Sequence, residues 1–85
     1  MEINYELQKQ IFEIIKNQLE LNDPPEVKIT FDRLKKLKFN DHQVRQLIGQ
    51  CIAVELFDIL YSGKEYDNER YIKHLKALPD EPFDD

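Results

Sequence analysis

The sequence predicts an all-α protein, a small four-helix bundle-like domain with a long central third helix. Three observations carry this prediction. Apolar residues recur at helical spacing, proline and glycine divide the chain into four segments, and 85 residues with 41% hydrophobic content suit one domain. We therefore expect residues 1–78 to form a single helical domain and 79–85 to form an acidic, flexible tail.

The first predicted helix spans about residues 3–21. Leu7, Ile11 and Ile15 follow one another at intervals of four, and charged residues lie on the opposite face. The Asn22-Asp23-Pro24-Pro25 run ends this helix, because a residue that precedes proline is pushed out of the α region.

The second predicted helix spans about residues 24–38, with Asp23 as its N-cap and Pro24 as its first residue. Its apolar line runs through Val27, Phe31 and Leu34. An alternative is that residues 26–30 form a short strand or an extended lead-in, since apolar and polar residues alternate there. We favour the helix because a lone strand is marginally stable, and the alternative stays open.

The third predicted helix spans about residues 42–62, from a cap at Asp41 to Gly63, which suits a left-handed residue. Its apolar face changes sides along its length, so we expect it to pack on one neighbour early and on others late. Gly49 and Ala53 lie four apart and leave a groove where another backbone can come close.

The fourth predicted helix spans about residues 69–78, begins after Asp67 or Asn68, and ends at Pro79. Its apolar line is formed by Tyr71, Ile72, Leu75 and Leu78.

One pattern is spread over about two thirds of the chain: Asn22-Asp23-Pro24-Pro25-Glu26, Arg33-Leu34, Asp41-His42, Arg45, Ile48-Gly49, Glu55, and Tyr71 to Leu78-Pro79. This pattern resembles that of small bacterial all-helical proteins and modules of unknown function. The resemblance implies a compact helical unit and transfers no catalytic or binding residue. Lys38 departs from the pattern, because a glycine often stands there and permits positive φ.

Charge and composition exclude several classes of protein. The chain carries 12 Lys and Arg against 17 Asp and Glu, a net charge of -5, and the acidity is concentrated in the tail. No apolar run approaches the roughly 18 residues of a membrane span, and the start of the chain lacks the features of a secretory signal. The single cysteine, Cys51, cannot form an intrachain disulfide. We therefore expect a cytoplasmic protein.

Two acidic side chains are the strongest candidates for catalysis. Glu55 and Asp58 lie three apart on one helical face and form a possible pair for acid–base or metal chemistry. We favour a solvated strip, because that face carries no apolar residue after Cys51. If the two carboxylates are buried, Arg33 or Lys36 is the expected partner.

The remaining reactive residues point away from catalysis. His42 and His74 are the only imidazoles and lie far apart in the sequence, and we expect His74 to face water. Cys51 has apolar neighbours and is expected in the core rather than as a nucleophile. Phosphate-binding glycine patterns are absent from the sequence. We therefore expect no enzyme activity, no metal and no cofactor.

A nucleic-acid-binding module over residues 31–50 is the alternative function. Two predicted helices joined by a short turn resemble a helix-turn-helix in length, and the region is locally basic. Its candidate contacts are Lys35, Lys36, Lys38, Gln43, Arg45 and Gln46. The acidic balance of the whole chain counts against this alternative.

The favoured function is a non-catalytic protein–protein interaction or accessory module. Its partner is an unknown protein or a second copy of the chain, so a homodimer is possible. The candidate contacts are aromatic: Tyr61, Tyr66, Tyr71 and Phe83.

Overall fold

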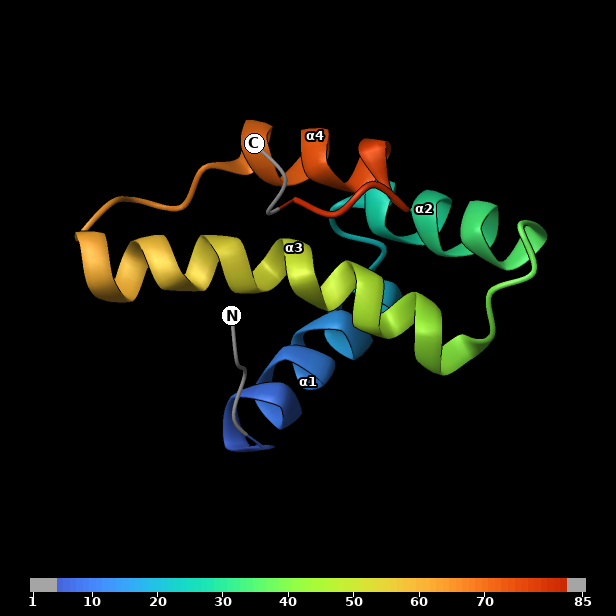
Figure 1. The fold of residues 1–85 in the computed structure, drawn as a ribbon, viewed down its shortest axis with the longest axis horizontal. Helices are drawn as coiled ribbons and strands as arrows, with labels where there is room; N and C mark the ends of the chain where they lie inside the picture. The colour runs from blue at the N-terminus through green and yellow to red at the C-terminus, as the bar shows by residue number, and fades with distance from the viewer. Residues whose placement is uncertain (1–4, 83–85) are drawn as a thin grey trace.

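The computed structural model of the chain describes residues 5–82, which form four helices and no strand (Figure 1). These helices are α1 (Tyr5–Leu21), α2 (Pro25–Lys36), α3 (Asp41–Ser62) and α4 (Asn68–Ala77). The predicted all-α class and the long third helix are confirmed. α3 is the longest helix at 22 residues, and it contacts each of the other three helices, as α2 also does.

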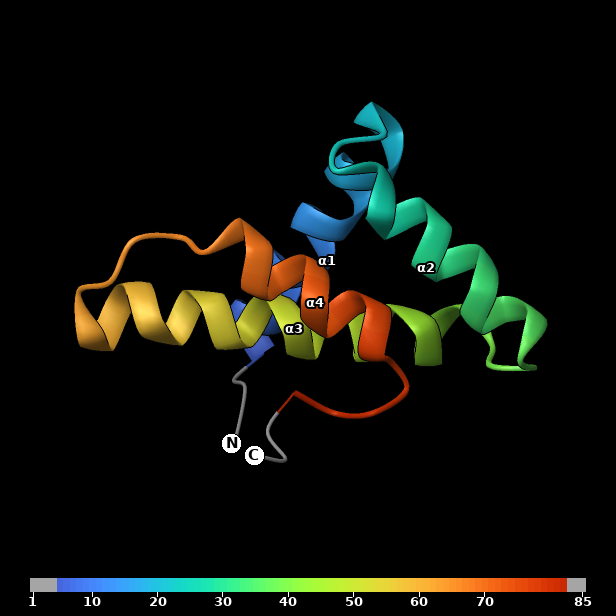
Figure 2. The same cartoon turned by 90° about the horizontal axis from the view of Figure 1, so that it is seen from above.

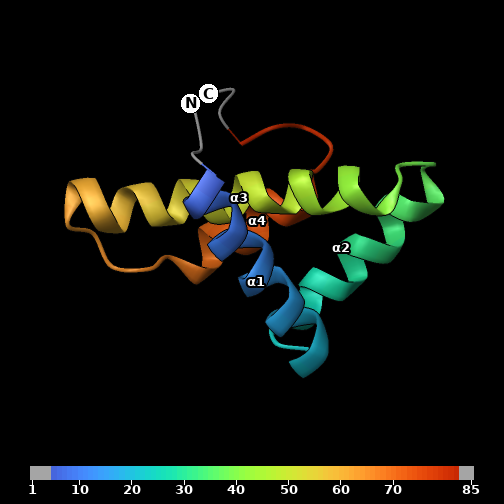
Figure 3. The same ribbon diagram turned by 90° about the horizontal axis from the view of Figure 1, so that it is seen from below.

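The four helices form a compact arrangement around α3. α1 and α2 diverge from their shared loop like the two sides of a V, whose open ends meet α3 (Figures 2 and 3). α4 lies beside the middle of α3, and it also contacts α2. The last turns of α3 extend beyond α1 and α4, at the left of Figure 1.

α2 confirms the helical interpretation of residues 26–30 but not the predicted cap. The N-cap is Pro24, which has an extended backbone (φ -73°, ψ 149°) and makes no side-chain capping bond. Pro24 itself precedes a proline, so the α region is closed to it, and the helix begins at Pro25 rather than at 24. Lys38 takes a positive φ of 78°, which ends the helix at Lys36, before the predicted residue 38.

α3 begins one residue earlier than predicted, because Asn40 rather than Asp41 is its N-cap. The Asn40 side chain accepts a hydrogen bond from the Gln43 N–H at 2.8 Å, and the Gln43 side chain accepts one from the Asn40 N–H at 2.9 Å. This reciprocal pair satisfies two backbone donors, which Asp41 cannot do from within the first turn. Gly63 adopts the predicted left-handed conformation (φ 64°) after the last residue of α3.

α4 is held at both ends. Asp67 caps its start by accepting the Arg70 N–H at 3.0 Å. Arg33 of α2 holds its end, since Nη1 donates to the Leu78 carbonyl at 2.7 Å and Nη2 to the Leu75 carbonyl at 3.0 Å. A cation on the final carbonyls of a helix also opposes the negative end of its dipole.

The core is mainly aliphatic, includes Tyr71, and draws residues from all four helices. Its fully buried members include Ile15, Leu34, Ile48 and Leu75. Gly49 lets α1 approach α3, because a Cβ there would lie 3.1 Å from Cγ2 of Ile11. The groove predicted at Gly49 and Ala53 is therefore filled by α1 of the same chain.

Candidate interaction surface

The two candidate catalytic carboxylates are engaged by Arg70 and are not a solvated strip. Glu55 is only 3% exposed, and its Oε2 accepts a hydrogen bond from Arg70 Nε at 2.7 Å. Its other oxygen, Oε1, accepts the Asp67 N–H at 3.1 Å. Arg70 Nη1 lies 2.6 Å from Asp58 Oδ2. The favoured prediction was therefore wrong, and so was the choice of Arg33 or Lys36 as partner.

This network fixes the start of α4 against α3. The hydrogen bond that Arg70 donates to Glu55, together with the nearby Asp58, raises the pKa of the Arg70 guanidinium. Both oxygens of Glu55 are occupied, so its carboxylate acts as a structural anchor. Sequence reasoning missed the partner because Arg70 lies 15 residues away, beyond the loop that follows α3.

Three other reactive side chains take no part in the bonds of this network: Cys51, His42 and His74. Cys51 is fully buried, as predicted, and burial raises the pKa of its thiol to about 12. His42 packs edge-on against Phe12, with ring centroids 5.9 Å apart. His74 is half-buried, and its Nδ1 is buried without a hydrogen-bond partner in the described structure, so the expectation that it faces water was wrong. Within residues 5–82, no group of three or more His, Cys, Asp and Glu is placed to hold a metal ion.

Half of the candidate nucleic-acid contacts are held by other residues of the chain. Asp41 binds both Lys35, at 3.1 Å, and Arg45, at 3.7 Å. The Arg45 guanidinium also lies over the Phe31 ring, 5.4 Å from its centroid. Gln43 belongs to the capping box of α3. The remaining three candidates are exposed: Lys36, Lys38 and Gln46.

The C-terminal end of α3 presents apolar side chains to solvent. We call residues 56–62 the arm, and its surface consists of Leu56, Phe57, Ile59, Leu60 and Tyr61. Leu60 is 63% exposed and Tyr61 is 76% exposed. The Phe57 and Tyr61 rings lie 5.1 Å apart, so they cover one side of the helix together. Leu56 packs against the core and Asp58 pairs with Arg70 of α4, whereas Ile59, Leu60 and Tyr61 stay exposed, so only the first part of the arm has the late packing partner that we expected.

A hollow of about 150 Å³ adjoins the arm between α1, α3 and the residues that lead into α4. Its walls are mainly aliphatic, from Ile14, Ile52, Leu56 and Ile59. Tyr66 and Tyr71 line another side, with ring centroids 6.2 Å apart. Leu56 and Ile59 belong to both the hollow and the arm surface, which makes the two features continuous.

The four predicted aromatic contacts have different environments. Tyr61 is exposed on the arm, and Tyr66 is 50% exposed at the hollow. Tyr71 is only 1% exposed, and its hydroxyl donates to Gln18 Oε1 at 2.9 Å. Tyr71 also lines the hollow, but its ring offers almost no area to a partner, so its contact stays a prediction with less support. Phe83 lies outside the described residues, and its contact stays a prediction.

The region around the arm and the hollow is acidic. Residues 55–70 contain five acidic and two basic side chains, a net charge of -3. Burial raises the pKa of Tyr66, and the nearby carboxylates of Glu55, Asp23 and Asp67 raise it further. The hydroxyl at the hollow therefore lies in a negative potential, while the basic side chains of α2 lie toward the other end of α3.

Searches against protein-family models, curated proteins and solved structures found no match to this chain. The resemblance to small bacterial helical proteins stays a prediction. None of the helices described here has the length and apolar character needed to cross a membrane.

Proposed function

We propose that this protein is a non-catalytic protein-interaction module that binds its partner through the arm surface and the adjoining hollow. The observation that carries this proposal is the exposure of Leu60 and Tyr61 on the last turns of α3, next to the aliphatic hollow.

The exposed apolar side chains of the arm lie next to one another. A single exposed leucine is ordinary on a protein surface, but an apolar surface that continues around two helical turns is characteristic of docking sites. Tyrosine is enriched at the centres of interfaces, where it supplies a large contact area and a polar tip. Burying the arm against a partner removes this apolar area from water, which favours association.

The chemistry of the polar residues supports a non-catalytic role. Both oxygens of Glu55 accept hydrogen bonds within the chain, and Asp58 is paired with the same arginine. Glu55 is also only 3% exposed, so its carboxylate is a poor general base, which must reach a substrate proton. The Cys51 thiol, with its pKa near 12, stays protonated at neutral pH and is a poor nucleophile.

The nucleic-acid alternative has less support. Lys35, Gln43 and Arg45 already bind groups within the chain, and two of them share Asp41 as a partner. Lys36 and Lys38 stay exposed, but two lysines provide a weak hold on a phosphate backbone.

The proposal is tested by comparing immobilised wild type with Leu60→Ser/Tyr61→Ser in extracts of the native host. Leu21→Ser is the matched control, because Leu21 is 75% exposed on α1 and lies outside the arm. We expect one or more proteins to bind the wild type and the control equally and to be lost from the arm variant. Equal recovery by all three baits would contradict the proposal.

A further inference from the structure

The occupant of the arm surface must match both its apolar and its acidic character. Leu60 and Tyr61 need an apolar counterpart, and the surrounding carboxylates need positive charge around that counterpart. The complementary surface is therefore apolar at its centre and carries lysine or arginine at its edge.

This chain carries such a surface on the outer side of α2. Ile29 on α2 is 64% exposed, and Leu37, the C-cap residue of α2, is 53% exposed. Lys28 pairs with Asp32 at 3.3 Å, so we define the basic face as Ile29, Lys36, Leu37 and Lys38, whose two lysines are exposed. Residues 28–41 contain five basic and two acidic side chains, a net charge of +3. The basic face thus has the composition that the arm requires.

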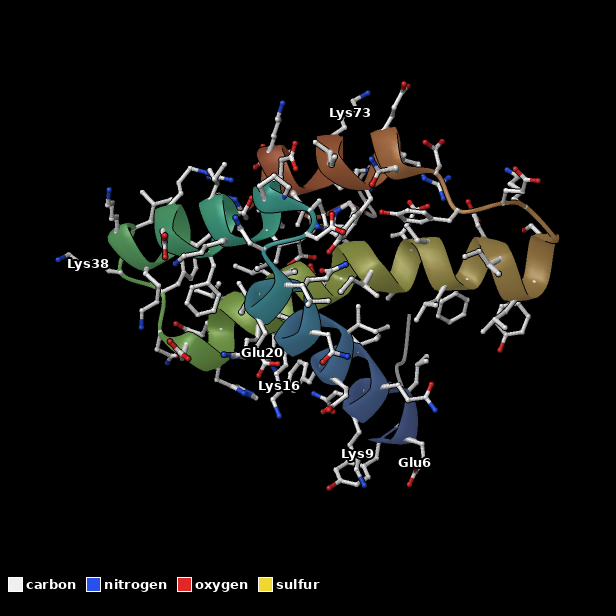
Figure 4. The ribbon with its side chains drawn as sticks, turned by 180° about the vertical axis from the view of Figure 1, so that it is seen from behind. Glu6, Lys9, Lys16, Glu20, Lys38 and Lys73 are labelled. Atoms are coloured by element: carbon white, nitrogen blue, oxygen red, sulfur yellow. The ribbon has the colours of Figure 1, made fainter. Side chains whose placement is uncertain are left out.

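The two surfaces lie at opposite ends of the molecule. Lys38 projects from the α2–α3 turn, at the other end of the molecule from the arm (Figure 4). α3 joins these ends, and its 22 residues span about 33 Å. One molecule therefore cannot bring its own basic face to its own arm.

We propose that a second copy of this chain occupies the arm surface and the hollow, by placing its basic face against them. Two copies with antiparallel α3 helices bring each arm beside the basic face of the other. The same contact then forms twice around a twofold axis, so the assembly closes as a dimer. This inference rests on the proposed docking role of the arm and identifies its occupant.

Sedimentation of the full chain as a function of concentration and salt tests the inference. We expect the mass to rise from 10.2 kDa toward about twice that value with concentration, and the dimer to weaken at high salt because its edges are charged. A wild type that stays monomeric up to about 500 μM would overturn it, since a dimer weaker than this has little effect at cellular concentrations.

Two charge-reversal variants identify the surfaces. Lys36→Glu/Lys38→Glu alters the basic face, and Glu65→Lys/Glu69→Lys alters the acidic segment that follows the arm, in the loop and the first turn of α4; all four side chains are exposed. In a dimer of either variant alone, like charges face each other at both contacts. We therefore expect its dimer Kd to rise by about tenfold or more. An equimolar mixture pairs opposite charges at both contacts, and we expect it to restore dimerisation. A dimer that neither variant weakens, or a mixture that stays monomeric, would overturn the inference.

Matched controls carry the same change in charge on α1, away from both surfaces: Lys9→Glu/Lys16→Glu and Glu13→Lys/Glu20→Lys. We expect both controls to dimerise like the wild type, and far-UV circular dichroism confirms that every variant is folded. If the chain is monomeric while arm-dependent capture of another protein persists, the inference fails and the proposed function stands. If capture also fails, both are wrong.

Discussion

Arg70 and Glu55 form the contact that joins α4 to α3: Arg70 Nε donates to Glu55 Oε2 at 2.7 Å, and the acceptor is a side chain only 4% exposed. The same guanidinium pairs with Asp58, which lies one turn further along α3. A buried carboxylate needs such a partner, because an unpaired charge inside a protein is strongly unfavourable. The pair therefore sets how α4 begins and where the loop before it lies.

Arg70→Met should lower the free energy of unfolding by about 2 to 3 kcal/mol, because it leaves Glu55 buried without its cation. The value is below that for a fully buried pair, since the Arg70 side chain is 29% exposed and water screens part of the loss. Urea denaturation measures it. Lys28→Met is the control, since it breaks an exposed pair with Asp32 and should change stability by less than about 0.5 kcal/mol. Equal effects of the two substitutions would contradict this role of Arg70.

Arg33→Met should lower the free energy of unfolding by about 2 kcal/mol, because charge-assisted bonds to the last carbonyls of α4 are lost. Arg33→Lys keeps the charge but loses the bidentate geometry, so we expect its free energy of unfolding to lie between those of the wild type and Arg33→Met. Hydrogen exchange should show the loss of protection concentrated in α4. Lys36→Met, which alters an exposed side chain on the same helix, should leave α4 protected.

The fold illustrates what a sequence specifies locally. The period of the apolar residues predicted four helices. The two prolines marked the start of α2 to within one residue, and Gly63 marked the end of α3, because their backbone preferences act at short range. The caps were harder to predict. Asp41 and Asn40 are both good caps in isolation, and the choice depended on whether Gln43 reached back to complete the box.

The candidate site could be predicted only in part. The exposure of Tyr61 follows from its place near the end of a long helix, but the burial of Tyr71 and Glu55 depends on how α4 folds back onto α3. The packing of α4 on α3 is a tertiary feature. A helical wheel of α3 alone does not include α4, so it placed the α3 carboxylates in solvent. One signal was available in the sequence. Arg70 directly precedes the apolar line of α4, so a positive charge had to lie at the edge of that line.

Stability should fall with rising pH above about pH 9. Burial raises the pKa of Cys51 from 9.0 to about 12, so the folded state holds this proton more tightly than the unfolded state. The contribution is complete below pH 9 and is lost as pH rises toward 12, by about 1.4 kcal/mol per pH unit. Tyr71, whose pKa burial also raises, adds to the same trend above its ordinary value of 10.0.

Cys51→Ala separates the two contributions. It removes the thiol and leaves a small cavity, so its stability at pH 7 should be lower by about 1 kcal/mol. Its stability should then decline less steeply than that of the wild type between pH 9 and 10, before tyrosine titrates. Parallel curves for the two proteins across this range would mean that the thiol is not the group responsible.

Nucleic acid should not bind the chain appreciably. A fluorescence polarisation titration with a mixed-sequence duplex at low salt should show no saturation at tens of micromolar, where non-specific binders, with Kd values of about 1 to 100 μM, are detected. Saturable binding that weakens with salt and is lost in Lys36→Glu/Lys38→Glu would instead support the alternative function.

The central claim is that the arm of α3 docks onto a protein partner, and photo-crosslinking from Tyr61 tests it most directly. p-Benzoylphenylalanine at position 61 replaces one exposed aromatic side chain with another, and the same group at Leu21 serves as the control. Illumination in cells of the native host should give a discrete covalent adduct from position 61, a dimer of the chain or a complex with another protein, and none from position 21. Absence of any adduct from position 61, or the same adducts from both positions, would contradict the claim.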